Sequence, residues 1–125
     1  MLSTLMNFTT MTVQHKFVDV IPDILEQGVV YVSIKREVVI HLCICGCGNE
    51  VVTPLAPFEW ELTFDGETIT LDPSIGNWQF PCRSHYFIRR NQIITAPKWS
   101  DEKIKKQRDK HRRLTWRFFG VKNKD

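Results

Sequence analysis

The residues best suited to chemistry are cysteines and a histidine gathered in two short segments, residues 41–49 and 81–85. All four cysteines of the chain lie in these segments. Three of them alternate along the first segment, and the fourth stands three positions before a histidine in the second. Cysteine and histidine are the ligands that Zn²⁺ takes in tetrahedral protein sites. The two segments therefore predict one zinc site.

More candidate ligands are present than a tetrahedral ion needs. The pair Cys82-x-x-His85 has ordinary metal-ligand spacing. Two glycines in residues 41–49 can adopt positive φ and let the chain fold around an ion. His41 is a weaker candidate, because a histidine beside an apolar strand is more often packed or exposed. The favoured ligand set is Cys45, Cys47, Cys82 and His85, with Cys43 as the alternate.

Zinc binding is not the only role that four clustered cysteines can have. Disulfides fit poorly, because cysteines two positions apart rarely meet the required Cβ separation and torsion. Four reduced cysteines packed as small apolar groups are the simplest alternative. An iron–sulfur cluster is a minority alternative: Cys82-x-x-His85 matches one arm of a Rieske-type centre, but the other arm would need Cys-x-His.

No catalytic residue is predicted. A zinc site with three or more thiolates is usually closed and structural. The chain has no His-Glu-x-x-His segment, and it lacks the His-x-Glu half of the zinc deaminase pattern. A spare cysteine acting as a nucleophile is the enzymatic alternative. The favoured interpretation is a non-enzymatic protein with a structural metal.

Length and composition predict an ordinary single domain. The chain has 125 residues and carries no long apolar run, so no transmembrane helix is expected. No charged segment followed by an apolar one opens the chain, so we expect no secretion signal. Clustered cysteines without such a signal favour a reducing compartment, and the predicted location is the cytoplasm.

Charge divides the chain into an acidic body and a basic end. Residues 98–125 carry eleven Lys and Arg against four Asp and Glu, whereas residues 1–97 carry six against ten. A helix is predicted from Ser100, the expected N-cap, to about Arg117. Its basic face is expected to bind a protein partner, with nucleic acid as a possible alternative and no membrane. The candidate partner-binding residues are Lys105, Lys106, Arg112 and Arg113.

The remaining elements predict a mainly β (α+β) fold, a small antiparallel β domain stapled by one zinc site, with a C-terminal basic helix. Residues 72–78 are expected to form a loop, and its Trp78 is a further candidate for partner binding. Three parts are predicted: a flexible leader or edge strand (1–12), a zinc-binding β domain (13–97) and a basic helix and tail (98–125). The expected strands are residues 15–21, 29–34, 38–42, 50–53, 60–64, 68–71, 86–89 and 92–95, with a single helical turn at 22–28.

Three stretches together resemble a known bacterial family. They are residues 41–55, which begin His-Leu-Cys-Ile-Cys-Gly-Cys-Gly-Asn, residues 60–66, and residues 73–87, which contain Ser-Ile-Gly-Asn-Trp and Pro-Cys-Arg-Ser-His. The family is a small uncharacterised Cys/His family encoded beside genes for ubiquitin-like conjugation, including activating enzymes, conjugating enzymes and JAB-type peptidases. The resemblance implies metal binding at the matching Cys and His positions and association with a ubiquitin-like pathway.

The predicted function is a zinc-binding accessory or adaptor protein of a bacterial ubiquitin-like modification or antiphage system. A nucleic-acid-binding zinc protein is the first alternative. A metal-dependent or cysteine-dependent enzyme is the second. The two binding alternatives differ in their salt dependence, since phosphate contacts weaken steeply as salt rises.

Overall fold

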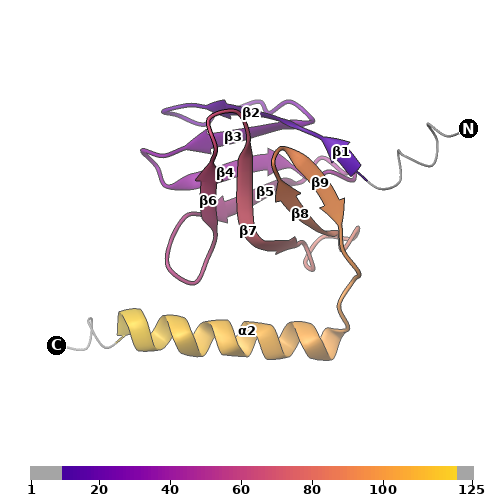
Figure 1. Ribbon diagram of the computed structural model, residues 1–125. Helices are drawn as coiled ribbons and strands as arrows, with labels where there is room; N and C mark the ends of the chain where they lie inside the picture. Colours follow the sequence, from indigo (N-terminus) through magenta and orange to yellow (C-terminus); the bar gives the residue numbers. More distant parts are fainter. Residues whose placement is uncertain (1–9, 121–125) are drawn as a thin grey trace, which may run out of the picture.

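The computed structural model describes residues 10–120, which fold into two β-sheets and a C-terminal helix (Figure 1). The five-stranded sheet has the order β1-β9-β8-β7-β6, and the four-stranded sheet has the order β2-β3-β4-β5. All strand pairs are antiparallel except β2 with β3. The strands are β1 (Thr10–Thr12), β2 (Gln14–Phe17), β3 (Val29–Ser33), β4 (Val38–Leu42), β5 (Glu50–Pro54), β6 (Glu61–Phe64), β7 (Ile69–Gly76), β8 (His85–Arg89) and β9 (Gln92–Thr95).

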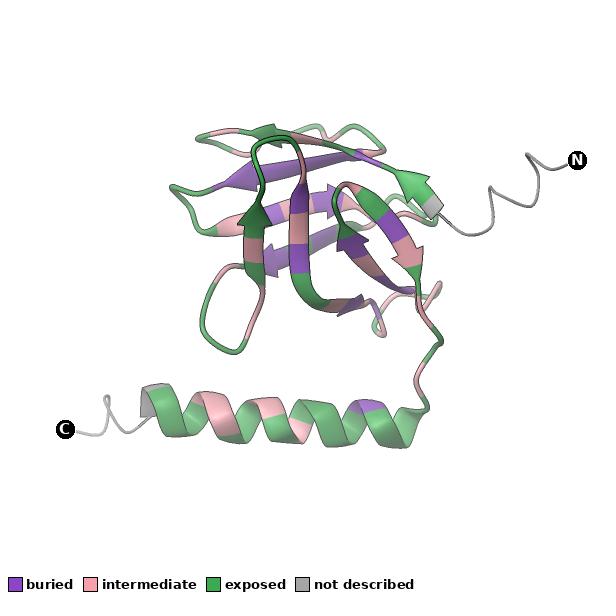
Figure 2. Ribbon diagram, in the orientation of Figure 1, coloured by how far each residue is buried: buried purple, intermediate pink, exposed green. Residues whose placement is uncertain are grey.

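The core lies between the facing sheets. Val30 and Val39 from the four-stranded sheet share one buried cluster with Leu71 and Ile88 from the five-stranded sheet. Burial alternates along β4 and β5, as expected for strands with one face turned inward. Figure 2 shows the buried residues on the inner strands of both sheets. Apolar burial between two layers therefore holds the β domain together.

The chain passes from one sheet to the other at Val13. This residue is buried, and its N–H donates to the carbonyl of Asn91 (2.8 Å) in the turn between β8 and β9 of the five-stranded sheet. The next N–H, of Gln14, donates to the carbonyl of Gly28 beside the four-stranded sheet (2.9 Å). β1 (Thr10–Thr12) is an edge strand of the five-stranded sheet, and the rest of the predicted leader lies outside the described residues.

The helix α2 (Asp101–Thr115) follows the last strand and runs beneath the β domain in Figure 1. The predicted N-cap is confirmed, because the Ser100 hydroxyl accepts from the N–H of Lys103 (3.2 Å). A five-residue π-helical turn, Trp116–Gly120, continues it. The helix is exposed over most of its surface, and Ile104 is its buried residue (Figure 2).

The predicted fold class is confirmed: the protein is mainly β, with a C-terminal helix. Two local predictions were wrong. The expected helical turn at 22–28 is an irregular loop, in which the N–H of Glu26 donates to the Tyr31 hydroxyl (3.0 Å). The expected loop at 72–78 is mostly strand, because β7 runs on to Gly76 and pairs there with β8 after a bulge between Leu71 and Ile75.

Candidate metal centre and serine–histidine site

Four cysteine sulfurs gather at one end of the β domain. Cys43, Cys45 and Cys47 come from the loop between β4 and β5, and Cys82 comes from the loop between β7 and β8. The four Sγ atoms all lie within 4.8 Å of one another, close enough to hold a metal ion. Cys43 Sγ lies 3.5 Å from Cys45 Sγ and 3.7 Å from Cys82 Sγ. Thiolates about 2.3 Å from a tetrahedral zinc lie about 3.8 Å apart. The sulfur–sulfur distances of the four cysteines therefore fit a tetrahedral zinc site.

Backbone hydrogen bonds shape the first cysteine loop. The N–H of Cys43 donates to the carbonyl of Asn49 (2.8 Å), which closes the base of the loop. The N–H of Gly46 then donates back to the carbonyl of Cys43 (3.1 Å). Gly46 and Gly48 have φ of +86° and +84°, a region that glycine occupies at little cost. These turns bring alternate cysteines to one side of the loop.

Polar neighbours tune the thiols in opposite directions. Burial alone would raise the pKa of Cys82, but hydrogen bonds from the Ser84 side chain and backbone outweigh it and lower that pKa to about 6. The backbone N–H of Asn49 lowers the pKa of Cys47. Burial raises the pKa of Cys43, and it raises that of Cys45 to about 12. A lowered pKa at Cys47 on one loop and at Cys82 on the other favours the thiolate form that metal binding requires.

His85 lies outside the sulfur group, although the favoured ligand set included it. Its Nδ1 lies 2.6 Å from the carbonyl oxygen of Pro97, and its Nε2 lies 2.9 Å from Ser74 Oγ. His41 is also outside the group, with its Nε2 2.6 Å from the Tyr86 hydroxyl. The structure therefore brings Cys43 together with the other cysteines, while His85 contacts a serine.

The hydrogen bonds of His85 define its tautomer. A carbonyl oxygen only accepts, so Nδ1 carries the proton that is donated to Pro97. In the neutral ring Nε2 is then an acceptor, and the Ser74 hydroxyl donates to it. A histidine held in this way can remove the proton of a serine hydroxyl that attacks an electrophile. The Ser74–His85 pair therefore has the geometry of a nucleophile and its base.

Strand pairing explains how the two residues meet. His85 begins β8 and pairs with Gly76 of β7. The register shift between Leu71 and Ile75 removes Ser74 from the regular ladder, and its half-buried side chain reaches the histidine. The segment between them contains Cys82, so the serine–histidine pair and the sulfur group share one connection.

Aromatic rings enclose the histidine. The His85 ring centroid lies 5.0 Å from that of Trp78 and 5.2 Å from that of Trp99, and the two indoles stack at 5.7 Å. A methyl group at Gly76 would meet the Trp78 ring at 2.5 Å, so this packing needs a glycine there. The indoles restrict the imidazole to an orientation that serves Ser74.

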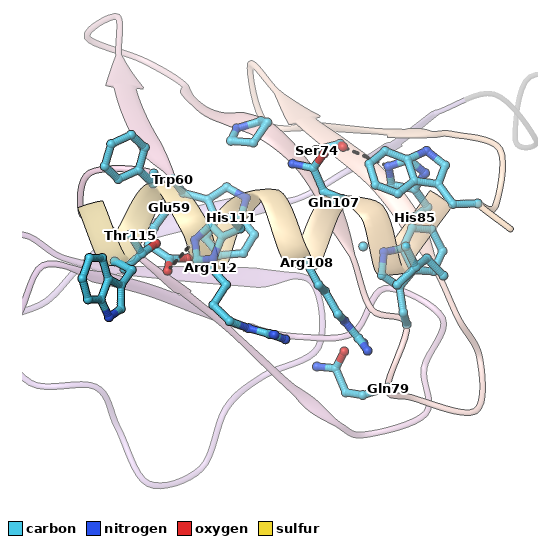
Figure 3. Close-up of a pocket in the computed structure, with 17 residues that line it drawn as sticks. Glu59, Trp60, Ser74, Gln79, His85, Gln107, Arg108, His111, Arg112 and Thr115 are labelled. Carbon is cyan, nitrogen blue, oxygen red and sulfur yellow. Dashed lines mark hydrogen bonds and ion pairs between the residues drawn. The ribbon is translucent and has the colours of Figure 1, made fainter. Parts of the chain in front are cut away.

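The pair opens into a cleft of about 920 Å³ between the β domain and α2 (Figure 3). All four tryptophans of the chain line it, together with Ser74 and His85. Contacts at both ends of α2, and at the π-helical turn that contains Phe118, join this part of the chain to the β domain. Arg83 pairs with Asp101 (2.9 Å), His111 Nε2 lies 3.1 Å from Glu59 Oε1, and the rings of Phe58 and Phe118 meet at 5.6 Å.

The predicted partner-binding residues are divided by this cleft. Trp78 and Arg112 line it, Lys105 lines the groove that adjoins it, and Lys106 and Arg113 lie on exposed parts of α2 outside both. Sequence reasoning assigned no chemical role to Ser74 and overlooked Arg108, which also lines the cleft. The Ser74–His85 spacing follows no common motif, so only the bulge and the strand register reveal the pair.

Comparison with known families agrees with the part of the chain that builds both sites. Residues 17–96 match a family model described as "Bacterial ubiquitination-like system serine protease (BubE)". The chain belongs to the BubE family. The matched residues include the sulfur group, Ser74 and His85, whereas α2 lies outside them. The predicted link to a bacterial ubiquitin-like system is confirmed at the level of the family, and the description adds an activity that the resemblance did not imply.

Neither further comparison found a related protein, and the described helices are not membrane-spanning. No curated protein and no solved structure is significantly similar to this BubE family member. In the part of the chain that the structure describes, no helix has the length and apolar character needed to cross a membrane.

Proposed function

We propose that this chain is a serine peptidase of a bacterial ubiquitination-like system, with Ser74 as the nucleophile and His85 as its base. The observation that carries the proposal is the hydrogen bond between Ser74 Oγ and His85 Nε2 (2.9 Å), in a histidine whose Nδ1 is already engaged by Pro97. The description of the BubE family as a serine protease supports it. The aromatic cleft supplies room for a polypeptide beside the pair.

The proposed reaction is acyl transfer in two halves. Ser74 Oγ forms a bond to the carbonyl carbon of the scissile peptide while its proton moves to His85 Nε2. The C–N bond then breaks, and the proton passes from Nε2 to the departing amine. Water enters, gives a proton to Nε2 and attacks the acyl-serine ester, and the returned proton restores the Ser74 hydroxyl as the acid product leaves.

Pro97 takes the position that a carboxylate has in many serine peptidases. Its carbonyl oxygen accepts the proton of His85 Nδ1 and holds the ring in the reactive tautomer. A neutral carbonyl stabilises the imidazolium less than a carboxylate does, because it supplies a dipole in place of a full charge. Trp78 and Trp99 both contact the imidazole ring, and this packing helps to fix the orientation of His85 that a carboxylate would otherwise hold.

The metal in this proposal is a structural zinc. The proposed ligands replace His85 of the expected set with Cys43, because both nitrogens of His85 have other partners. A site of four thiolates is closed and leaves no position for substrate, so the peptide chemistry belongs to Ser74. An iron–sulfur cluster is the alternative occupant. A thiolate site is stable in a reducing compartment, which supports a cytoplasmic protein. The proposed ligands are Cys43, Cys45, Cys47 and Cys82.

A fluorophosphonate probe tests the nucleophile without requiring a known substrate. We expect the full zinc-loaded chain to be labelled at Ser74, as mapped by peptide mass spectrometry. Ser74→Ala should abolish labelling, and His85→Gln should slow it by about 100-fold or more, since general base catalysis contributes about that factor. Ser100→Ala is the matched control, because that hydroxyl caps α2 away from the histidine. Labelling that persists in Ser74→Ala would refute the assignment.

A non-enzymatic adaptor is the second candidate, favoured by the exposed basic surface of α2. In that case, reversing the charge of four basic residues of α2 to Glu should weaken partner binding, while the zinc content and the melting temperature stay nearly unchanged. Steep loss of binding with salt to any nucleic acid would instead favour phosphate recognition. An unreactive Ser74 in a folded chain that still binds its partner would favour the adaptor. The residues to reverse are Lys105, Lys106, Arg112 and Arg113.

A further inference from the structure

Two arginines of α2 face the cleft that contains the serine–histidine pair. Arg108 and Arg112 are one helical turn apart, and both line this cleft and the adjoining groove beside Gln79. Figure 3 shows both side chains extending from the helix to the same side, with the Gln79 amide near the Arg108 guanidinium. The two cations are therefore presented to whatever occupies the cleft.

Acidic neighbours leave these cations largely available. Among the described residues no carboxylate pairs with Arg108. Arg112 reaches only Asp109, at 3.7 Å, and the Arg112 side chain remains 77% exposed. Glu59, the acidic residue that lines the cleft, lies against His111 at 3.1 Å. The cleft is thus lined by apolar indole rings, and the guanidinium groups on its helix side are largely unpaired with carboxylates.

We propose that Arg108 and Arg112 form a subsite that binds an acidic side chain of a polypeptide substrate in the cleft that Ser74 and His85 also line. This inference rests on the proposed peptidase function and specifies its substrate class. A guanidinium presents paired N–H donors that match a carboxylate, and a carboxylate between two arginines gains attraction from both. An acidic peptide fits better than nucleic acid, because phosphate backbones are bound by many cations. Among the described residues, Arg108 and Arg112 are the lysines and arginines that line the cleft, and Arg83 and Lys105 join them only in the adjoining groove, where Asp101 and Asp109 also lie.

The subsite gives α2 a direct role in substrate selection. The helix lies outside the residues that match the BubE family, yet it supplies the cationic wall of the cleft. The helix completes the binding site and does not block it. A chain shortened before α2 would retain Ser74 and His85 but lose the preference for acidic residues.

Peptide selection by the full-length Ser74→Ala chain tests the subsite without cleavage. The probe is a randomised library of short synthetic peptides, and retained peptides are sequenced. We expect Asp and Glu to be enriched about three-fold at one or two positions, the size typical of a partly exposed ion pair. The enrichment should disappear in Arg108→Gln/Arg112→Gln. It should persist in Lys106→Gln/Lys110→Gln, which removes two charges at the same spacing outside the cleft.

The outcomes separate this inference from the proposed function. Fluorophosphonate labelling of Ser74 in the native chain tests the peptidase alone, so a native chain that is not labelled refutes the proposed function without deciding the peptide preference. Lys106→Gln/Lys110→Gln, outside the cleft, should leave this labelling unchanged. Absence of acidic enrichment, or equal loss in both double variants, overturns the subsite. A single-stranded oligonucleotide provides the last test. The subsite is overturned if the oligonucleotide displaces the peptides and if both double variants lose affinity for it to the same extent, because α2 would then be a general phosphate-binding surface.

Discussion

Asn77 and Ser84 are joined twice across the base of the loop that connects β7 to β8. The Asn77 N–H donates to the Ser84 carbonyl (2.8 Å), and the Asn77 side-chain amide donates to Ser84 Oγ (2.9 Å). Ser84 Oγ in turn lies 3.3 Å from Cys43 Sγ and 3.5 Å from Cys82 Sγ. The asparagine therefore links the strand that carries the nucleophile to the sulfur group.

Asn77→Ala should weaken both sites. Asn77 is only 3% exposed, and its loss leaves Ser84 Oγ without a buried donor. We expect the free energy of unfolding to fall by about 1–3 kcal/mol, the usual cost of an unsatisfied buried polar group. Urea denaturation measures the fall, and a chelator competition should show faster zinc release. Gln92→Ala, at an exposed position, is the control, and equal behaviour of the two variants would contradict the link.

Removal of the metal should impair the serine–histidine pair without touching it. The native chain is expected to contain about one zinc atom, as measured by elemental analysis. Cys82→Ser should lose the zinc and lower the melting temperature by about 10 °C or more, because structural zinc contributes several kcal/mol to folding. Fluorophosphonate labelling of Ser74 should fall in parallel, since the loop that contains Cys82 also orients His85.

Chelation and zinc return provide the control for this prediction. Native chain stripped by a chelator should behave like Cys82→Ser, and added zinc should restore labelling in the native chain alone. Iron with visible charge-transfer colour would convert the zinc assignment to an iron–sulfur cluster. A zinc-free chain with unchanged melting would show that the site is not structural.

Gly76→Ala should displace the indole that encloses His85. The new methyl group would lie 2.5 Å from the Trp78 ring, so the ring or the strand must move. Overpacking of this kind costs about 1–3 kcal/mol. A double-mutant cycle with Trp78→Ala, followed by chemical denaturation, measures the coupling. If Gly76→Ala costs as much in the Trp78→Ala background as in the native chain, the clash is not the cause.

Much of the fold could be predicted because its strands have strong local signals. Residues 29–34 and 38–42 are rich in Val and Ile and flank a polar turn, and the structure has the strands Val29–Ser33 and Val38–Leu42 there. Segments governed by distant contacts were missed. Pro73 and Gly76 indicate a loop locally, yet pairing with β8 makes this segment a strand.

The sulfur group could be predicted from local sequence, whereas the serine–histidine pair could not. Close spacing revealed the cysteines, because three of them occur within five residues. The partner of His85 could not be read from spacing, since a Cys-x-x-His pair suggests a metal as readily as any other role. The bulge that turns Ser74 toward His85 depends on strand register, which local sequence specifies weakly.

Ile104→Ala should loosen α2 from the β domain. Ile104 is 5% exposed and lines the cleft, whereas most of the helix is in solvent. Truncation of a buried isoleucine costs about 2–5 kcal/mol, which should exceed what the surface contacts of the helix can supply. Limited proteolysis should then cut within α2 while the β domain stays intact. Leu114→Ala, at a half-buried position, is the control and should cause a smaller change.

Asp65 should make the β6–β7 turn sensitive to acid. The backbone N–H of Thr68, its hydroxyl and the N–H of Glu67 donate to the carboxylate, and they lower its pKa from 3.8 to about 2. A lowered pKa means that the carboxylate stabilises the fold above pH 3.8 and loses this effect as the pH falls toward 2. Asp65→Asn should lower the melting temperature at neutral pH. Melting curves of the two proteins should converge at acid pH, and a constant difference would contradict the prediction.

The acceptor of the His85 Nδ1 proton belongs to the main chain, at Pro97. No side-chain substitution removes a peptide oxygen, so alanine scanning would report two chemical participants and overlook the third. Residue 97 can be substituted without loss of this hydrogen bond, provided that the backbone conformation is preserved. Chemical synthesis can reach it: an ester in place of the peptide bond between Pro97 and Lys98 would leave every side chain intact, weaken this acceptor and remove the N–H of Lys98. Insertions and deletions near residue 97, more than point changes, are then the variation to which this site is vulnerable.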